Sequence, residues 1–371
     1  MVPNNYGPNI CNTPIGCLQI LQKGDFNIGD FDCQKHSRLN RGGVTHKSQE
    51  KMKKGIYLFL ILFLFSIPVK TFAAKYAGEF LALGVGARPL GMGGAFVAIA
   101  NDLTAGYWNP GGLVQIRRRG VAMMHSETFG ELLNHDYISY SKSIADTAAT
   151  AIGVSLIRLG GGGIKLTALP DPSRPPNATD NRPYVIKESG HADYTLFFTY
   201  AAERGQDLSW GANAKLIYRK IADNSAFGLG ADLGGLLTLG HFRLGLNLQD
   251  ATTTLLAYDS GEKESILPTL KLGTAFQTEI LRGNLTIATD VDLRFEGRKT
   301  SAQRWLGIAS GDLHLGGEYT YREIISLRIG SDQGDLTAGL GLILKKFQVD
   351  TSFSPHKRLD NSYKVSAFFY F

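Results

Sequence analysis

The last nine residues of the chain alternate between two kinds of side chain. In an extended strand, one face carries only apolar or aromatic residues: Tyr363, Val365, Ala367, Phe369 and Phe371. The opposite face is mixed: Lys364, Ser366, Phe368 and Tyr370. Successive side chains of a strand point to opposite faces, so one face of this strand is suited to hydrocarbon, as in a strand between lipid and a lumen. On this segment alone, a strand of an ordinary β-sandwich is the alternative.

A leader precedes the alternating part of the chain. Met52 is followed by two lysines, an apolar run at 56–67 and a pair of alanines that ends at Ala74. This is the pattern of a secretory signal peptide, and its apolar run is shorter than the ~20 residues that a membrane-spanning helix needs. We therefore expect residues 52–74 to be a signal peptide, and residues 1–51 to be an over-extended reading frame upstream of it.

Leaving out this leader changes the composition that bears on function. All three cysteines, Cys11, Cys17 and Cys33, lie in it, so we expect no disulfide or thiol site in the exported protein. Residues 1–74 also hold 9 of the 39 Lys and Arg and 4 of the 33 Asp and Glu, which leaves a net charge of about +1. A nearly neutral chain without a basic tail gives no case for a nucleic-acid partner.

The alternation continues from residue 119 to the end of the chain. We expect fourteen strands, at residues 119–128, 135–144, 149–160, 191–203, 208–221, 224–239, 241–250, 266–279, 283–294, 311–322, 324–331, 335–344, 346–354 and 360–371. Residues 303–308 fit either a further strand or part of a loop that folds over the rim.

The lengths of the connections follow the order of these strands. The three long connections, at 161–190, 251–265 and 295–310, come after the third, seventh and ninth strands, and those after even-numbered strands are brief. Bacterial outer-membrane barrels have short turns at one end and longer loops at the other. The sequence therefore predicts an all-β fold, a 14-stranded antiparallel transmembrane β-barrel over residues 119–371.

Several of these strands carry charged residues on the face opposite to their apolar one. The residues are Asp193, Lys215, Arg219, Asp232, Asp290, Asp292 and Arg294. Charges are costly in a packed core unless they are paired, whereas the hydrated lumen of a barrel accepts them. They are candidates for shaping a pathway through the lumen. The alternative is that they pair with one another or with a plug.

Residues 75–118 lack the alternation of the strands. They contain a glycine-rich stretch at 84–94, a segment at 95–102 for which we expect a short helix, and the turn signal Asn109-Pro110-Gly111-Gly112. Fourteen strands enclose a lumen too wide to be filled by their own side chains. We therefore expect residues 75–118 to form a small helical hatch inside the barrel.

Residues 86–102 and 105–113 resemble the amino-terminal motif of the PorV/PorQ family, which is similar to the FadL-type outer-membrane transporters. The matching hatch residues are Gly91, Gly93, Gly94, Asn101, Asp102, Trp108, Asn109, Pro110 and Gly111. Gly112 departs from the motif, in which alanine is more frequent. The resemblance implies a fourteen-stranded barrel with an amino-terminal hatch, and it assigns Asn109 and Pro110 to that hatch rather than to a catalytic centre.

Motifs that would indicate an enzyme are weak. The glycine-rich segment 228–234 approaches a dinucleotide fingerprint, but its last glycine is one place late and it alternates as a strand. The histidines are scattered without the spacing of metal ligands. His125 and Ser126 point to opposite faces of one strand, which leaves Ser126 with His135 across the hairpin, or a solvated rim. We expect no catalytic, cofactor or metal site.

These inferences favour a noncatalytic barrel in the outer membrane of a Gram-negative-type bacterium, whose hatch gates passive transport of a hydrophobic or small amphipathic compound. The alternative is a scaffold or shuttle of a protein secretion or surface-attachment system, as in PorV-like members of type IX secretion. The expected partners are outer-membrane lipid, the barrel insertion machinery, and either a hydrophobic ligand or secretion-system proteins. Tyr363, Val365, Phe369 and Phe371 resemble the assembly signal read by the insertion machinery.

Overall fold

The structure is a computed structural model that describes residues 77–128, 132–145, 150–176, 180–297, 302–355 and 361–371. The predicted reading-frame extension, 1–51, and the predicted signal peptide, 52–74, lie outside these residues. Within the described ranges, none of the helices is both long enough and apolar enough to cross a membrane.

Seventeen antiparallel strands form one sheet in the described part of the chain. Their bounds are β1 Gly120–Thr128, β2 Leu133–Ala145, β3 Thr150–Ala168, β4 Tyr184–Arg204, β5 Leu208–Ile221, β6 Asn224–Leu239, β7 Phe242–Gln249, β8 Thr254–Tyr258, β9 Lys263–Ile266, β10 Thr269–Ile280, β11 Gly283–Arg294, β12 Arg304–Leu306, β13 Ala309–Tyr321, β14 Ile325–Asp332, β15 Asp335–Leu344, β16 Phe347–Ser354 and β17 Ser362–Tyr370.

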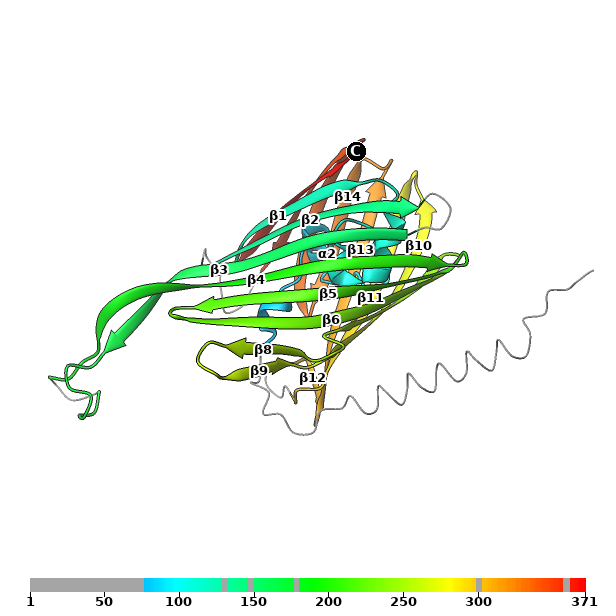
Figure 1. Cartoon of the computed structure of the whole chain (residues 1–371). Helices are drawn as coiled ribbons and strands as arrows, with labels where there is room; N and C mark the ends of the chain where they lie inside the picture. Colours follow the sequence, from blue (N-terminus) through cyan, green and yellow to red (C-terminus); the bar gives the residue numbers. More distant parts are fainter. Residues whose placement is uncertain (1–76, 129–131, 146–149, 177–179, 298–301, 356–360) are drawn as a thin grey trace, which may run out of the picture. The chain divides into compact units, whose positions relative to one another are not determined.

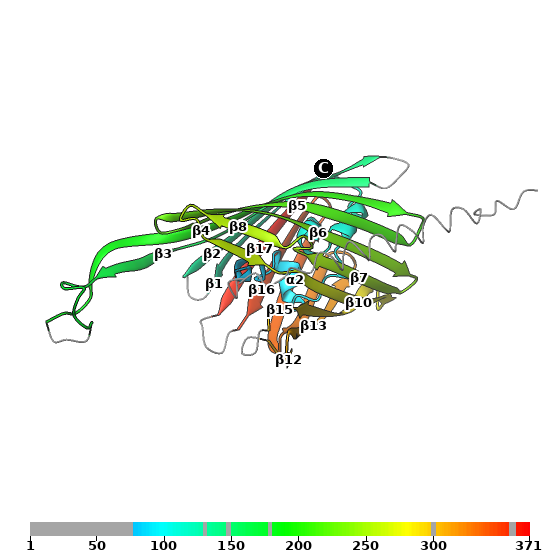
Figure 2. The same ribbon diagram turned by 60° about the horizontal axis from the view of Figure 1, so that its bottom comes forward.

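Fourteen of these strands close into a barrel. β1 to β7, β10, β11 and β13 to β17 pair in chain order. The last strand then pairs with the first, from Gly120 opposite Tyr370 to Glu127 opposite Tyr363. Closure leaves no free edge along the barrel wall, and Figures 1 and 2 show the ring of strands from two directions. The predicted fourteen-stranded barrel is confirmed.

The side chains of the barrel strands alternate between an exposed outward face and a buried inward face. On β17, Tyr363 and Val365 are exposed outward, whereas Ser366 and Phe368 are buried inward. Outward aromatic rings lie in contact at two levels of neighbouring strands: Tyr194 with Tyr218, whose centroids are 6.3 Å apart, and Tyr200 with Trp210, at 5.7 Å. An apolar outer band flanked by aromatic girdles is the arrangement of barrels that cross a membrane.

The two ends of the barrel differ in their connections. At one end, which we call the short-turn end, the turns between β4 and β5, β6 and β7, β10 and β11, β13 and β14, and β15 and β16 contain two or three residues each. At the other, the long-loop end, 250–268 and 295–308 connect barrel strands. The predicted parity of the connections is therefore present.

At the long-loop end, the further strand predicted as one alternative for 303–308 is present, and two other details differ from the sequence prediction. The connection predicted at 251–265 contains the hairpin of β8 and β9, which pairs with β6. Residues 304–306 form β12, paired with β13 but outside the fourteen-strand ring. The loop predicted at 161–190 begins later, because β3 continues through its glycines by means of a bulge between Gly161 and Ile164 while β4 supplies the matching partner strand.

Residues 77–115 lie inside the barrel, and we call them the plug; residues 116–119 connect it to β1. Its helices are the 3₁₀ helix η1 (Glu79–Leu81), α2 (Ala87–Gly91), α3 (Ala105–Trp108) and the 3₁₀ helix η2 (Pro110–Gln115). α2 packs against β14 to β17 and η2 against β3 to β6. Segment 95–102, for which a short helix was predicted, instead forms turns. The N–H groups of Ile99 and Ala100 both bond to the Phe96 carbonyl, but Ala100 has a φ of +28°, outside the helical range, so the chain does not continue as a helix.

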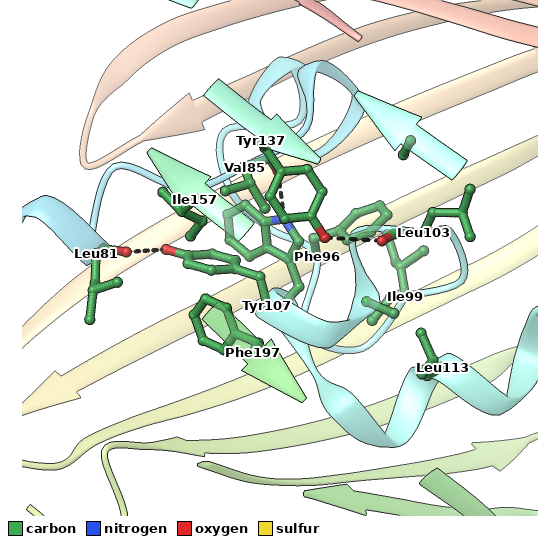
Figure 3. Packing of buried hydrophobic residues seen from close by; sticks show 14 of the residues in the cluster. Leu81, Val85, Phe96, Ile99, Leu103, Tyr107, Leu113, Tyr137, Ile157 and Phe197 are labelled. Atoms are coloured by element: carbon green, nitrogen blue, oxygen red, sulfur yellow. Dashed lines mark hydrogen bonds between the residues drawn. The ribbon is translucent and has the colours of Figure 1, made fainter. Parts of the chain in front are cut away.

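The centre of the plug is an apolar cluster shared with the wall. Tyr107, Phe96 and Leu103 of the plug are buried with Tyr137 of β2 and Phe197 of β4 (Figure 3). The polar ends of the aromatic residues are satisfied: the Tyr137 hydroxyl donates to the Leu103 carbonyl at 3.0 Å, and the Tyr107 hydroxyl donates to the Leu81 carbonyl. The plug thus supplies much of the hydrophobic core of the barrel, together with inward residues of the wall.

Candidate functional site

The plug backbone packs directly against glycines of the barrel wall, and we call each of these contacts a seat. A Cβ atom added at Gly316 of β13 would lie 2.5 Å from the carbonyl oxygen of Met92, and one at Gly211 of β5 would lie 2.5 Å from the carbonyl carbon of Pro110. Gly273 of β10 has the same relation to Ala98, at 2.8 Å from its nitrogen. The plug therefore contacts the wall backbone on several sides, with no room for intervening side chains.

The glycines of the hatch motif complete the seat of α2. Gly91 lies against Gly339 of β15, and its carbonyl accepts a hydrogen bond from the Thr337 hydroxyl at 3.2 Å. Gly93 has a φ of +65°, and a Cβ there would lie 2.5 Å from the nitrogen of Ser331. The chain must therefore have glycine at this turn both for its left-handed backbone and for its contact with β14.

The Trp108-Asn109-Pro110-Gly111 part of the motif fixes the other side of the plug. Trp108 donates its indole N–H to the Val85 carbonyl at 2.8 Å. The Asn109 amide donates to Val97 at 2.9 Å and to Gly235 of β6 at 3.0 Å, while its oxygen accepts the Gly111 N–H and so caps η2. Pro110 occupies the first turn of η2, where a missing N–H costs nothing.

Arg88 of α2 links the plug to the wall by ionic bonds. Its guanidinium binds Glu318 of β13 through two nitrogens, at 2.8 and 2.7 Å, and it also contacts Asn101 at 2.7 Å and Asp102 at 3.2 Å. Burial by itself lowers the pKa of Arg88, but the carboxylates of Glu318, Asp102 and Asp350 together raise it by more, so the pKa lies above the usual range of arginine. Arg88 therefore stays charged, and Glu318 is shared with Arg328 of β14 at 2.6 Å.

Asp290 of β11 is a second anchor for the plug. One of its carboxylate oxygens accepts the backbone N–H groups of Phe96 at 2.6 Å and Val97 at 2.7 Å. The side chain is almost completely buried, so these donors have no access to water. These two bonds hold the turn that begins at Phe96 against the wall.

We expect Asp290→Ala to loosen the plug. The substitution leaves two buried N–H donors unpaired, and each unpaired buried donor costs about 1–3 kcal/mol, so docking should weaken by about 2 kcal/mol or more. Hydrogen–deuterium exchange of plug peptides that contain Phe96 and Val97 should accelerate. Asp290→Asn is the matched control, because it retains an acceptor oxygen and should accelerate exchange less. Unchanged exchange in the alanine variant would show that Asp290 is no anchor.

The other predicted lumen charges are inward and paired. Arg219 donates to Asp193 at 2.7 Å, and Lys215 contacts Asp232 at 2.8 Å and Asp250 at 2.6 Å. Further pairs are Lys271 with Asp292 and Arg294 with Asp312 at 3.0 Å. Apart from Arg294, these predicted residues are buried. Their pairing beside a packed plug agrees with the alternative interpretation, in which these charges pair with one another or with the plug. A role in a transport pathway stays a prediction.

The residues considered for catalysis are separated as their strand positions require. His125 is exposed outward and binds Asp136 at 2.7 Å, whereas Ser126 is buried inward. Ser126 lies in register with His135, but its hydroxyl is bonded to that of Thr128 at 3.1 Å. In the ranges that the structure describes, no three His, Cys, Asp or Glu residues are grouped so as to hold a metal ion.

Comparisons with known proteins identify the fold. No family model matches the chain, and no curated protein matches it. The solved structure of the toluene transporter TbuX of Ralstonia pickettii is 14% identical and covers 78% of this chain and 98% of that chain, with a TM-score of 0.53. The toluene transporter TodX of P. putida is 13% identical and covers 78% of this chain and 99% of that chain, with a TM-score of 0.54. At these identities the likeness shows a shared barrel fold.

Proposed function

We propose that this protein is an outer-membrane barrel of FadL-like, PorV/PorQ type that passes hydrophobic or small amphipathic compounds without catalysis, gated by the plug. The observation that carries the proposal is a fourteen-strand barrel whose lumen is filled by a segment held through hydrogen bonds and ion pairs. Such contacts are reversible, so the plug can be displaced without covalent change. The fold shared with two toluene transporters supports a hydrophobic cargo.

Engineered disulfides between the plug and the barrel wall, here called staples, test gating directly because they can be reduced. A Cβ added at Gly106 of α3 would lie 3.8 Å from the Cβ of Thr199 on β4, and one at Gly91 of α2 would lie 3.5 Å from the Cβ of Ser352 on β16. Both distances suit a disulfide, and no cysteine occurs at 77–371 to interfere. The quadruple cysteine variant should lose toluene uptake by cells when oxidised and recover it after reduction, because the staples hold both sides of the plug against the wall.

The four single-cysteine variants are the controls, since none can form a staple. They should take up toluene equally with and without reductant. Equal uptake by the oxidised and the reduced quadruple variant, with the disulfides verified by mass spectrometry, would show that plug displacement is not needed for transport.

The scaffold or shuttle function remains a second candidate because of one feature of the long-loop end. β3 beyond Gly160 and β4 before His191 pair with each other and extend past the ends of β2 and β5 as a two-stranded ribbon (Figure 1). Tyr184, Val185 and Ile186 are exposed on it. If the ribbon holds secreted proteins, Tyr184→Ser combined with Ile186→Ser should reduce their co-purification from native membranes while leaving toluene uptake unchanged.

A further inference from the structure

A cavity of about 830 Å³ opens at the short-turn end, beside the plug. Its wall includes Arg88 and Asn101 of the plug and Glu318 of β13, together with residues of the turns that follow β13 and β15. Because the charges of Arg88 and Glu318 neutralise each other, this inner part of the wall carries no net charge from the pair. We call this cavity the vestibule.

The outer wall of the vestibule is positively charged. Arg118, Arg322 and Lys345 line it and are exposed, and Glu323 is the acidic residue that accompanies them. For none of the three cations does the structure give a carboxylate partner in the part of the chain that it describes. An anion that entered the vestibule would therefore meet three cationic side chains from separate segments of the chain.

Apolar residues connect the vestibule to the outside of the barrel. Ile343 and Leu344 of β15 lie on its wall, and Leu344 is exposed outward. A second cavity of about 430 Å³ shares Asn284, Arg322 and Glu323 with the vestibule and runs over the turn after β10, where Leu281 is 80% exposed. Cationic groups inside and exposed apolar side chains at the rim are complementary to an amphiphile whose head is anionic and whose tails lie in a membrane.

We propose that the vestibule binds the phosphate group of a glycerophospholipid from the membrane leaflet that surrounds the short-turn end. Arginine and lysine bind phosphate through charge-assisted hydrogen bonds, and the three cations line a cavity of about 830 Å³. The acyl chains would lie along the rim beside Leu281 and Leu344. This inference rests on the membrane placement in the proposed function and not on gating by the plug.

The test is native mass spectrometry of the full barrel with phosphatidylglycerol. The variant Arg118→Gln, Arg322→Gln, Lys345→Gln should lower the lipid-bound fraction by about tenfold or more, because the loss of even one charge-assisted bond is worth roughly a factor of ten. The matched control is Lys142→Gln, Arg204→Gln, Lys346→Gln, which removes the same charge from exposed positions that do not line the vestibule. It should bind lipid as the unaltered protein does.

Competition identifies the source of the phosphate. Glycerol 3-phosphate at the same concentration should not displace the lipid, since it lacks the tails that contact the rim. Displacement by it would assign the vestibule to soluble phosphate esters and overturn the lipid proposal, as would equal lipid binding by the two triple variants. Heat-dependent mobility in gel electrophoresis verifies that each variant is a folded barrel. If the triple variant does not fold, Arg118→Gln alone is used, because Arg118 lies in the exposed connection before β1 and its replacement disturbs the barrel less. The staple experiment remains informative whichever result is obtained here.

Discussion

Gly316→Val is expected to displace the plug and so to open the lumen of the barrel. The added Cβ would lie 2.5 Å from the carbonyl oxygen and 3.2 Å from the carbonyl carbon of Met92, and backbone atoms cannot turn away as a side chain can. Overpacking of this kind costs about 1–3 kcal/mol, which multiplies the population of undocked plug roughly 5- to 150-fold. The β13 strand itself tolerates valine, which favours extended backbone. Swelling of liposomes that contain the variant should therefore become faster by a similar factor.

The neighbouring glycine provides the control for this prediction. Gly317 is on the same strand but faces outward, and a Cβ there meets nothing closer than 3.8 Å, at Ile329. Gly317→Val should leave swelling at the level of the unaltered protein. If the two variants swell liposomes at the same rate, the seat at Gly316 does not hold the plug.

Deleting Phe369 to Phe371 is expected to reduce strongly the amount of barrel in the membrane. The deletion removes the pairs of Phe369 with Val121 and of Tyr370 with Gly120, which close β17 onto β1. It also removes the bond from the Phe371 nitrogen to the Arg119 carbonyl, at 2.9 Å. The terminal aromatic residues that resemble the assembly signal are lost at the same time. Immunoblots of membrane fractions measure the yield.

Phe347→Ala separates the loss of an aromatic contact from the loss of the terminus. Phe347 packs on Phe369 with their centroids 4.7 Å apart, so its removal takes away the same stacking but keeps the whole of β17. It should lower the yield much less than the deletion. A normal yield after the deletion would refute both the closure argument and the proposed signal.

The barrel was predictable because every strand must repeat one simple pattern. Lipid outside and plug inside force alternation along β4 and β5, and turn residues mark where each of the fourteen strands ends. The ribbon at the end of β3 was missed because its glycines at 160–163 normally break a strand. They are tolerated here because β4 offers a continuous partner, a property that local sequence does not show.

The contacts that hold the plug were less predictable. Gly316 and Gly317 are neighbouring residues of the same type, yet Gly316 contacts the plug backbone and Gly317 faces outward. Alternation placed Asp290 on the inner face, but it did not indicate that its carboxylate binds the N–H groups of Phe96 and Val97. Arg88 and Glu318 are 230 residues apart, and the only hint of their pairing was a charge within an otherwise apolar, glycine-rich segment.

The short connection between the plug and the wall has a kinetic consequence. η2 ends at Gln115 and β1 begins at Gly120, so a displaced plug stays attached to the rim by residues 116–119. Its return is a unimolecular step governed by a high effective concentration rather than by diffusion through bulk solution. If the plug gates transport as proposed, its openings should therefore be brief and self-terminating, so that single molecules cross while the cell keeps its permeability barrier.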